Sequence, residues 1–326
     1  MVLITGANGF VGKLLCEEML HQGWRVRAAL RSPRQLPAGQ EPVIVGTIDG
    51  RTDWTNALSG ADVVIHLAAR VHVMKDSAAD PLEEFLKVTL HGTANLAQQA
   101  AHAGVKRLVY VSSIKVNGKQ TIEGQAFTEL SKPDPQDPYG FSKCEAERAL
   151  HQVAAESSLE IVTIRPPLVY GAEVKGNFAQ ILGVLAKGNP LPLASIHNLR
   201  SLVYVNNLVD ALITCANQPA AAGQTYLVSD GDDISTPDLL RQLGTAMGHP
   251  ARLFFCPPPL LKSVARLIGK TDQIKRLVDS LQVDNGKIRR ELSWIPPYTL
   301  QQGLQATAEW HRDAEKFQKN LKNAPD

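Results

Sequence analysis

Two residues able to move a proton, Tyr139 and Lys143, stand four positions apart where a predicted helix, Phe141–Glu156, begins. Four residues of helical spacing put two side chains next to each other on one face. A free tyrosine has a pKa of about 10, which is too high for efficient proton transfer at neutral pH. A neighbouring ammonium favours the phenolate and lowers that pKa. The pair is therefore a candidate acid and base catalyst.

A serine lies where it could assist this pair. The predicted strand Leu108–Val111 runs directly into Ser112 and Ser113. A hydroxyl at a strand end can hydrogen-bond a reacting oxygen and hold it beside the phenol. A Tyr-x-x-x-Lys match is weak evidence by itself, because the chain holds six tyrosines. The order of the segments strengthens it, and we predict Ser113, Tyr139 and Lys143 as the catalytic set.

A glycine-rich segment near the N-terminus could hold the phosphates of a dinucleotide. It joins a predicted strand, Val2–Thr5, to a predicted helix, Lys13–Gln22, with the spacing GxxGxxG rather than GxGxxG. Glycines let the backbone turn tightly and approach a pyrophosphate closely, and the first N–H groups of the helix face its negative charge. The residues predicted to contact the cofactor here are Gly6, Asn8, Gly9, Phe10, Val11 and Gly12.

The end of the second predicted strand, Arg25–Leu30, bears on which dinucleotide binds. An acid there hydrogen-bonds a free ribose 2′-hydroxyl, whereas an arginine accommodates a 2′-phosphate. This strand is followed by Arg31 and then Arg34, with no carboxylate between them. Guanidinium groups bind phosphate in a bidentate manner, so we favour NADP(H), with NAD(H) as the alternative. Ile48 and Asp49, after the third strand, are predicted to border the adenine.

Short apolar runs alternate with helical patterns up to about residue 170. Runs without strict alternation, such as Val63–Leu67 and Ile161–Ile164, are typical of strands covered by helices on both faces. The predicted helices Lys13–Gln22 and Leu82–Ala103 are each followed by a glycine that can cap them. Strand and helix in repetition predict an α/β fold with a doubly wound parallel sheet of the Rossmann type.

The composition of the sequence changes after Gly171: prolines become frequent, and helical segments dominate. A chain of 326 residues is also long for one compact core. We therefore expect a dinucleotide-binding domain over residues 1–171, joined by a segment near residues 200–230. A smaller mixed substrate domain is expected over residues 172–326.

Composition and charge bear on whether the protein binds nucleic acid, inserts into a membrane or is exported. A net charge of +2 without long basic runs argues against a nucleic-acid partner. No apolar stretch reaches the roughly 20 residues of a spanning helix, so we expect no membrane insertion. Because a strand is predicted to start at Val2, we expect no signal peptide before the fold, and we expect a cytoplasmic protein. The amphipathic stretch Leu260–Ile268 could touch a membrane surface, although its composition favours a core or lid helix.

The cysteines have no metal-ligand spacing, so we predict no metal site and interpret them as buried thiols in a reducing compartment. They are Cys16, Cys144, Cys215 and Cys256.

These segments together resemble the extended short-chain dehydrogenase/reductase superfamily over essentially the whole chain. The resemblance implies that Ser113, beside Ser112, polarises the substrate oxygen. It implies that Tyr139 is the general acid and base, and that Lys143 binds the nicotinamide ribose while lowering the tyrosine pKa. The matching segments are ITGANGFVG (4–12), DVVIHLAA (62–69), HGTANLAQQA (91–100), LVYVSSIKVNG (108–118), DPYGFSKCEAE (137–147), RPPLVYG (165–171) and RSLVYVNNLVDA (200–211).

The chain departs from the pattern of this superfamily at two places. It has Val116-Asn117-Gly118 where the family often has Val-Tyr-Gly, and Thr89 where an asparagine is common. Both changes bear on substrate detail, and neither removes the proton relay. The residues that the resemblance places along the cofactor groove are Leu67, Ala68, Ala69, Pro166, Pro167, Leu168 and Val169.

Within this superfamily the chain is most similar to the nucleotide-sugar branch, so a UDP-sugar is the expected substrate. The resemblance places Asn177 and Arg200 at its diphosphate, with Arg276 as a second cation. Ser112 and Ser113 complete the predicted substrate-binding set. A homodimer through the helices predicted over residues 82–103 and 141–156 is also implied.

The reaction is narrowed by Ile114 and Lys115, which stand where nucleotide-sugar 4,6-dehydratases carry an Asp-Glu pair, so dehydration is not expected. Residues 113–118 and 280–284 resemble reductases of UDP-4-keto-6-deoxy-N-acetylhexosamines, and Arg31 departs from the acid of UDP-galactose 4-epimerase. We therefore favour a 4-keto reductase of bacterial surface polysaccharide synthesis. The alternative is a UDP-glucose or UDP-N-acetylglucosamine 4-epimerase with tightly held NAD. Further alternatives are a non-catalytic NAD(P) sensor and a reductase of an apolar carbonyl such as a steroid.

Overall fold

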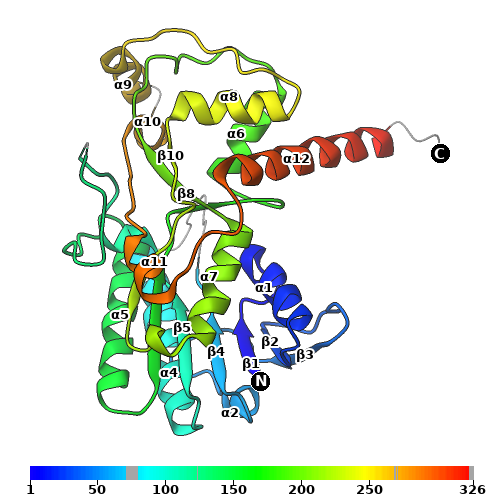
Figure 1. The fold of residues 1–326 in the computed structure, drawn as a ribbon, viewed down its shortest axis with the longest axis vertical. Helices are drawn as coiled ribbons and strands as arrows, with labels where there is room; N and C mark the ends of the chain where they lie inside the picture. The colour runs from blue at the N-terminus through cyan, green and yellow to red at the C-terminus, as the bar shows by residue number, and fades with distance from the viewer. Residues whose placement is uncertain (71–79, 123, 268, 270, 323–326) are drawn as a thin grey trace.

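The computed structural model describes residues 1–322 apart from 71–79, 123, 268 and 270. Its largest feature is a parallel sheet of seven strands in the order β3-β2-β1-β4-β5-β6-β9, with helices on both faces (Figure 1). This arrangement confirms the predicted fold class. The strands are β1 (Val2–Thr5), β2 (Val26–Leu30), β3 (Gln40–Ile44), β4 (Val63–His66), β5 (Arg107–Val111), β6 (Glu160–Arg165) and β9 (Thr225–Leu227).

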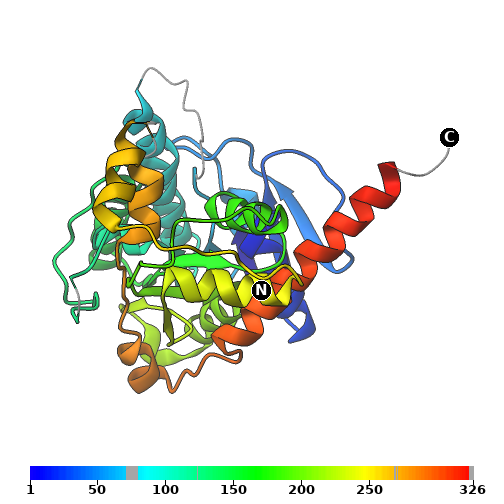
Figure 2. The ribbon, with the colours of Figure 1, turned by 90° about the horizontal axis from the view of Figure 1, so that it is seen from above.

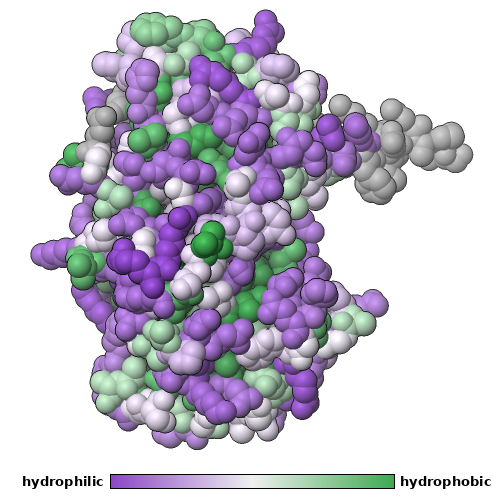
Figure 3. All heavy atoms as spheres, viewed as in Figure 1, coloured by the Kyte–Doolittle hydropathy of each residue, from purple (hydrophilic) through white to green (hydrophobic). Residues whose placement is uncertain are grey.

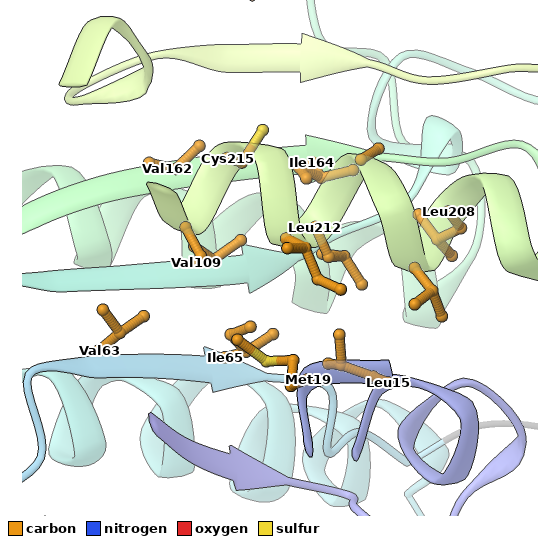
Figure 4. Packing of buried hydrophobic residues seen from close by; sticks show 14 of the residues in the cluster. Leu15, Met19, Val63, Ile65, Val109, Val162, Ile164, Leu208, Leu212 and Cys215 are labelled. Carbon is orange, nitrogen blue, oxygen red and sulfur yellow. The ribbon is translucent and has the colours of Figure 1, made fainter. Parts of the chain in front are cut away.

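Two layers of helices bury the faces of this sheet. Figure 4 shows one layer, in which Leu15 and Met19 of α1 and Leu212 of α7 point at apolar strand residues. Strands β1 and β4 are buried along their whole length, which explains why their sequences do not alternate. The covering helices are α1 (Phe10–His21) and α7 (Val205–Asn217) on that face, and α4 (Gly92–His102) and α5 (Pro138–Ala155) on the other.

The strand order brings β1 beside β4, the point at which the winding of the chain reverses. In open parallel sheets, ligands bind outside the carboxyl ends of the strands at such a point. Here β1 leads into the glycine-rich loop, β4 into Leu67–Ala69, and β5 into Ser112 and Ser113. The predicted cofactor and catalytic segments therefore share one edge of the sheet.

A smaller sheet of three strands, in the order β10-β8-β7, lies beyond that edge (Figure 1). Helices pack with it around a second apolar core that includes Phe178, Leu243 and Leu304. The pair α9 and α10 lies at the far end of this part, side by side (Figures 1 and 2). The elements are β7 (Leu168–Tyr170), α6 (Asn177–Ala186), β8 (Arg200–Tyr204), β10 (Asp233–Ile234), α8 (Thr236–Ala246), α9 (Pro258–Leu267), α10 (Thr271–Val278) and α12 (Leu300–Lys322).

The chain crosses between the two sheets more than once. Helix α7 and strand β9 come after residue 171, yet α7 packs on α1 and β9 pairs with β6 in the large sheet. The domain boundaries drawn from the sequence stay a prediction. Within the described residues, no helix is both long enough and apolar enough to cross a membrane. The remaining short elements are α2 (Thr55–Leu58), η2 (Ile114–Val116), η3 (Pro219–Ala221) and α11 (Gly286–Leu292).

One predicted helix, Leu82–Ala103, is wrong as a continuous α-helix. The structure has α3 (Pro81–Phe85), then a π-helical stretch, η1 (Leu86–His91), and then α4. The N–H of Gly92 bonds the carbonyl of Lys87, five residues back, as a π-turn requires. A Cβ at Gly92 would lie 2.7 Å from Cγ2 of Ile48, so glycine lets the helix pack closely there.

The interpretation of the cysteines also needs one correction. Cys16, Cys144 and Cys215 are buried, as predicted, but Cys256 is partly exposed. It lies in the loop that leads into α9, outside both layers of the large sheet. The third strand is also corrected: the apolar run Val43–Val45 predicts it there, but it spans Gln40–Ile44, because it pairs in register with β2 from Val26 onward.

Candidate active site

The turn after β5 holds Ser113 in place. Its Oγ accepts the N–H of Lys115 at 3.3 Å, so Ser113 caps η2. The carbonyl of Pro166 accepts the N–H of Ile114 at 3.0 Å and ties the turn to the segment after β6. The Ser113 side chain also hydrogen-bonds the phenol of Tyr139. Ser113 is therefore fixed by the backbone around it.

Helix α5 positions Tyr139 and Lys143. Its first turn is capped by Asp137, whose Oδ1 accepts the Gly140 N–H at 2.7 Å. Nζ of Lys143 lies 6.0 Å from the centre of the Tyr139 ring and donates to the carbonyl of Val111 at 2.7 Å. The structure thus brings together the serine, tyrosine and lysine that the sequence predicted as a set.

The protonation of this set follows from its burial. Burial raises the pKa of Tyr139 to about 12, Asp137 adds to the increase, and the hydrogen bond to Ser113 opposes it. Burial lowers the pKa of Lys143 to about 7, against the carboxylate of Glu147. Tyr139 is therefore protonated at neutral pH and can act as an acid. Each positive charge close to the phenol makes its basic form easier to reach.

A buried polar network lies directly beneath the catalytic set. Ser112 donates to Oε1 of Glu147, and both carboxylate oxygens of Glu147 bind the guanidinium of Arg165. Nη1 of Arg165 donates to the side-chain carbonyl of Asn117 at 3.1 Å. This network links α5, β6 and the turn after β5. Sequence reasoning missed it, although Glu147 lies four residues beyond Lys143 on the same helix face.

A second cation lies on the Tyr139 ring. Nζ of Lys115 is 5.3 Å from the ring centre and 2.8 Å from Oδ2 of Asp137. Phe85 of α3 packs edge-on against the same ring, with the centroids 6.0 Å apart. In the sequence, Lys115 argues only against dehydration, whereas the structure places it beside the phenol of Tyr139.

The glycine-rich loop has the geometry that a bound pyrophosphate needs. Gly6 has φ +68°, and a Cβ on it would lie 3.0 Å from the backbone nitrogen of Ala68. A Cβ on Gly12 would lie 2.1 Å from the carbonyl of Gly6. Helix α1 begins after Gly9 without a side-chain cap, so its first N–H groups are open to an anion. Asn8 and Gly9 are exposed, and Phe10 and Val11 are half-buried. These residues fit a dinucleotide.

A buried histidine connects this loop to the turn after β4. Nδ1 of His66 lies 2.6 Å from Oγ1 of Thr5, and Nε2 lies 3.0 Å from Oγ1 of Thr93. Oγ1 of Thr5 in turn accepts the N–H of Ala68 at 3.1 Å. Burial, with a contribution from Lys143, lowers the pKa of His66 to about 3 and keeps it neutral. Leu67, Ala68 and Ala69 are thereby held against the glycine-rich loop.

A cavity of about 350 Å³ opens beside this turn. Arg31, the predicted ribose contact, is one of its lining residues, and its role stays a prediction. Arg34, Ile48 and Asp49 are not among its lining residues; Asp49 instead uses its carboxylate to accept the N–H of Arg51. The residues that line the cavity are Arg31, Thr47, Ala69, Arg70, Glu84, Lys87 and Val88.

The predicted substrate cations come from distant parts of the chain and meet. Arg200 opens β8 and Arg276 lies on α10. Burial lowers the pKa of the Arg200 guanidinium, the nearby Arg276 lowers it further, and Asp279 opposes both. Nη1 of Arg200 also donates to the carbonyl of Asp279 at 2.9 Å. Arg276 is thus near enough for its charge to act on Arg200, and two such guanidinium groups suit a ligand with two negative charges.

The remaining predicted residues lie at the start of α6 and on the segment that follows β6. Asn177 is the first residue of α6 and is half-buried. Pro166 and Pro167 are buried, and Leu168 and Val169 are half-buried at the start of β7. The segment from Pro166 to Val169 thus leads from the catalytic turn to the second sheet.

The chain is similar to several characterised proteins. Residues 2–229 match the NAD dependent epimerase/dehydratase family. A UDP-glucose 4-epimerase of Vibrio cholerae is 44% identical over 310 residues, 94% of this chain and 94% of that protein. A 3 beta-hydroxysteroid dehydrogenase/Delta 5-->4-isomerase of Mycobacterium tuberculosis is 30% identical over 339 residues, 93% of this chain and 88% of that protein.

Solved structures share the fold. MoeE5 in complex with UDP-glucose and NAD has a TM-score of 0.76 and 24% sequence identity, covering 96% of this chain and 99% of that chain. At this identity the likeness shows a common fold alone. The predicted homodimer stays a prediction.

Proposed function

This chain belongs to the NAD dependent epimerase/dehydratase family, and within that family we propose that it is a 4-epimerase of a UDP-hexose. The observation that carries the proposal is the 44% identity to a UDP-glucose 4-epimerase over 94% of both chains. The assembled Ser113, Tyr139 and Lys143 supply the acid and base that such a reaction needs.

The choice between epimerase and reductase departs from the order favoured by the sequence. The sequence favours a 4-keto reductase, with the epimerase as the alternative. The comparisons support the alternative better, because the relative with 44% identity is an epimerase. The steroid-type alternative has a relative at 30% identity, but the paired guanidinium groups of Arg200 and Arg276 suit a diphosphate rather than an apolar ligand.

Different residues of the chain would bind the cofactor and transfer the proton. The glycine-rich loop, Lys143 and the segment after β6 would hold NAD, which when bound supplies the acceptor and donor of hydride at C4 of the sugar. Tyr139, which burial keeps protonated, must first release its proton to water; as the phenolate it then accepts the proton of the 4-hydroxyl when that carbon is oxidised, and it returns that proton when the ketone is reduced. Ser113 hydrogen-bonds the same oxygen and holds it beside the phenol. Nζ of Lys115 and Nζ of Lys143 lie 5.3 Å and 6.0 Å from the centre of the Tyr139 ring, where a positive charge would favour the phenolate against the effect of burial.

Inversion at C4 requires both faces of the sugar ketone to meet the same site. Arg200 and Arg276 would hold the diphosphate away from the reacting carbon. Because the anchor is then at the phosphates, the sugar ring is free to turn between oxidation and reduction. A single acid and base at Tyr139 can therefore serve both half-reactions.

Arg31 is the residue expected to determine how tightly the protein binds NADP relative to NAD. Because Arg31 lines the cavity beside Ala69, where the 2′-phosphate of NADP is predicted to lie, Arg31→Asp should weaken NADP binding at least about tenfold and leave NAD binding equal or tighter, the effect of losing one charge-assisted phosphate contact. Titration of both dinucleotides by fluorescence measures this. Arg34→Asp is the matched control, because Arg34 lies outside the cavity lining, and it should change either affinity less than about threefold. Equal effects of the two variants would show that Arg31 does not meet the 2′-phosphate.

The proposed function is tested by supplying UDP-glucose and UDP-N-acetylglucosamine separately, without any added reductant, and following the products by NMR. We expect catalytic conversion of at least one of them to its C4 epimer. The comparison reaction contains UDP-4-keto-6-deoxy-N-acetylglucosamine and NADPH. Consumption of NADPH in step with that ketone, with neither UDP-sugar epimerised, would replace the epimerase by the reductase.

A further inference from the structure

Exposed apolar side chains gather on one short segment of the second part of the molecule. Phe254 is 49% exposed, Phe255 73%, Leu260 55% and Leu267 86%. They account for four of the twelve large apolar side chains exposed in the described part of the chain, within 14 residues. Apolar surface also gathers along the top of the space-filling view, where the loop before α9 runs (Figures 1 and 3). A concentration of this kind marks a surface that meets another phase or partner.

Backbone hydrogen bonds hold the loop at Phe254 against the segment around Leu191 and Ala194. The N–H of Phe254 donates to the carbonyl of Leu191 at 3.0 Å, and the carbonyl of Phe254 accepts the N–H of Ala194 at 3.2 Å. On α9, Leu261 turns inward and is buried in the second apolar core. The helix therefore has a packed inner side, and Leu260 and Leu267, seven residues apart, share its outer side.

The charge of this region differs from that of the rest of the chain. Residues 250–278 contain six Lys or Arg and one Asp, whereas the remainder contains 28 Lys or Arg and 31 Asp or Glu. Arg252 and Arg266, close in sequence to the exposed phenylalanines and leucines, are themselves exposed. Basic residues beside exposed aromatic and aliphatic side chains are typical of a helix that lies on an anionic membrane surface.

We propose that the face formed by Arg252, Phe254, Phe255, Leu260, Arg266 and Leu267 docks on the surface of an anionic phospholipid bilayer. The phenylalanines and leucines enter the interface between headgroups and acyl chains, and the arginines meet lipid phosphates. A second copy of the chain is a poorer partner, because a symmetric contact would bring two such basic faces together. α10, which carries Arg276, packs on α9, so docking holds the substrate end of the protein near the bilayer. This inference does not rest on the epimerase proposal.

Sedimentation of the full chain with sucrose-loaded vesicles tests the proposal. Vesicles of three parts phosphatidylcholine to one part phosphatidylglycerol should pellet the protein at low salt, and vesicles of pure phosphatidylcholine should pellet far less. The double variant Phe254→Ser and Phe255→Ser should lower the partition coefficient at least about tenfold. The double variant Arg252→Gln and Arg266→Gln should remove most of the difference between the two lipid mixtures.

A matched control uses exposed apolar residues elsewhere. Ile122 is 72% exposed and Leu130 96%, and changing both to Ser should leave vesicle binding within about twofold of the unchanged protein. Circular dichroism and the midpoint of urea denaturation check that every variant is folded. Pelleting that is absent, or that the control pair lowers as much as the phenylalanine pair, would overturn the proposal.

Two other occupants of this face give different results, and either would also overturn it. If a second copy covers the face, sedimentation velocity will show a dimer that the phenylalanine double variant dissociates, with no vesicle binding. If the segment instead closes over the sugar nucleotide, the same variant will raise KM severalfold at unchanged kcat, again with no vesicle binding.

Discussion

Replacing Tyr139 by Phe should lower kcat about 10³-fold while changing dinucleotide affinity by less than about threefold. The phenol is the group that moves the proton of the sugar hydroxyl, and acid and base catalysis of this kind contributes about 10²–10⁴-fold. The ring itself remains, so its contacts with Phe85, Lys115 and Lys143 persist. Steady-state kinetics with a UDP-hexose and dinucleotide titration give the two quantities.

The same substitution outside the site provides the control. Tyr226 donates to Oε2 of Glu291 at 2.9 Å on the far strand of the large sheet, so Tyr226→Phe also removes one hydroxyl that is hydrogen-bonded. Its kcat should stay within about twofold of the unchanged protein. A Tyr139→Phe protein that keeps more than a tenth of the original kcat would show that another group transfers the proton.

Glu147→Ala should lower the free energy of unfolding by about 3–5 kcal/mol. Glu147 and Arg165 are 4% and 7% exposed, and the substitution leaves a buried guanidinium without its carboxylate. Ser112 loses its acceptor in the same step. Urea denaturation measures the change in the free energy of unfolding. The comparison requires that this free energy fall with urea concentration at the same rate in both proteins.

An ion pair on the same sheet whose carboxylate is exposed is the matched control. Glu160 pairs with Arg107 but its side chain is 44% exposed, and Arg107 keeps three backbone carbonyls as acceptors. Glu160→Ala should therefore cost less than about 1 kcal/mol. If the two substitutions cost the same, the network beneath the catalytic set does not stabilise the fold as argued.

Replacing both members of the buried pair separates stability from positioning. The double variant Glu147→Leu and Arg165→Met removes both charges together, so it should recover much of the stability that Glu147→Ala loses. Its kcat should remain low, because Ser112 and Asn117 are then no longer tied to α5 and β6. A double variant with full activity would show that the network acts on stability alone.

The sequence predicted the large sheet and the catalytic set because both rest on local patterns. Strands buried on both faces read as continuous apolar runs, and Tyr139 and Lys143 share a helix face by spacing alone. The glycine-rich loop is equally local, since a Cβ at Gly12 has no space whatever the rest of the chain does.

The features that the sequence did not predict depend on contacts between distant segments. Glu147 and Arg165 meet because α5 packs against β6, and no spacing rule connects them. The π-helical stretch from Leu86 to His91 has an ordinary helical composition, and only the register of its hydrogen bonds distinguishes it. The composition of the stretch Leu260–Ile268, of which Ile268 lies outside the described residues, predicts a core or lid helix, but amphipathicity does not say whether the apolar side finds a partner. The structure shows Leu260 and Leu267 exposed.

The central claim is that one site oxidises C4 and reduces it again, and the fate of the hydrogen on C4 tests it most directly. The measurement uses UDP-glucose carrying deuterium at C4, without added reductant, and follows the C4 signal of the UDP-galactose formed by mass spectrometry and NMR. We predict that the deuterium stays at C4 of the product, because the hydride removed from the substrate is the one returned to it. Product formed with hydrogen at C4, or product formed only when NADPH is supplied, would contradict the account.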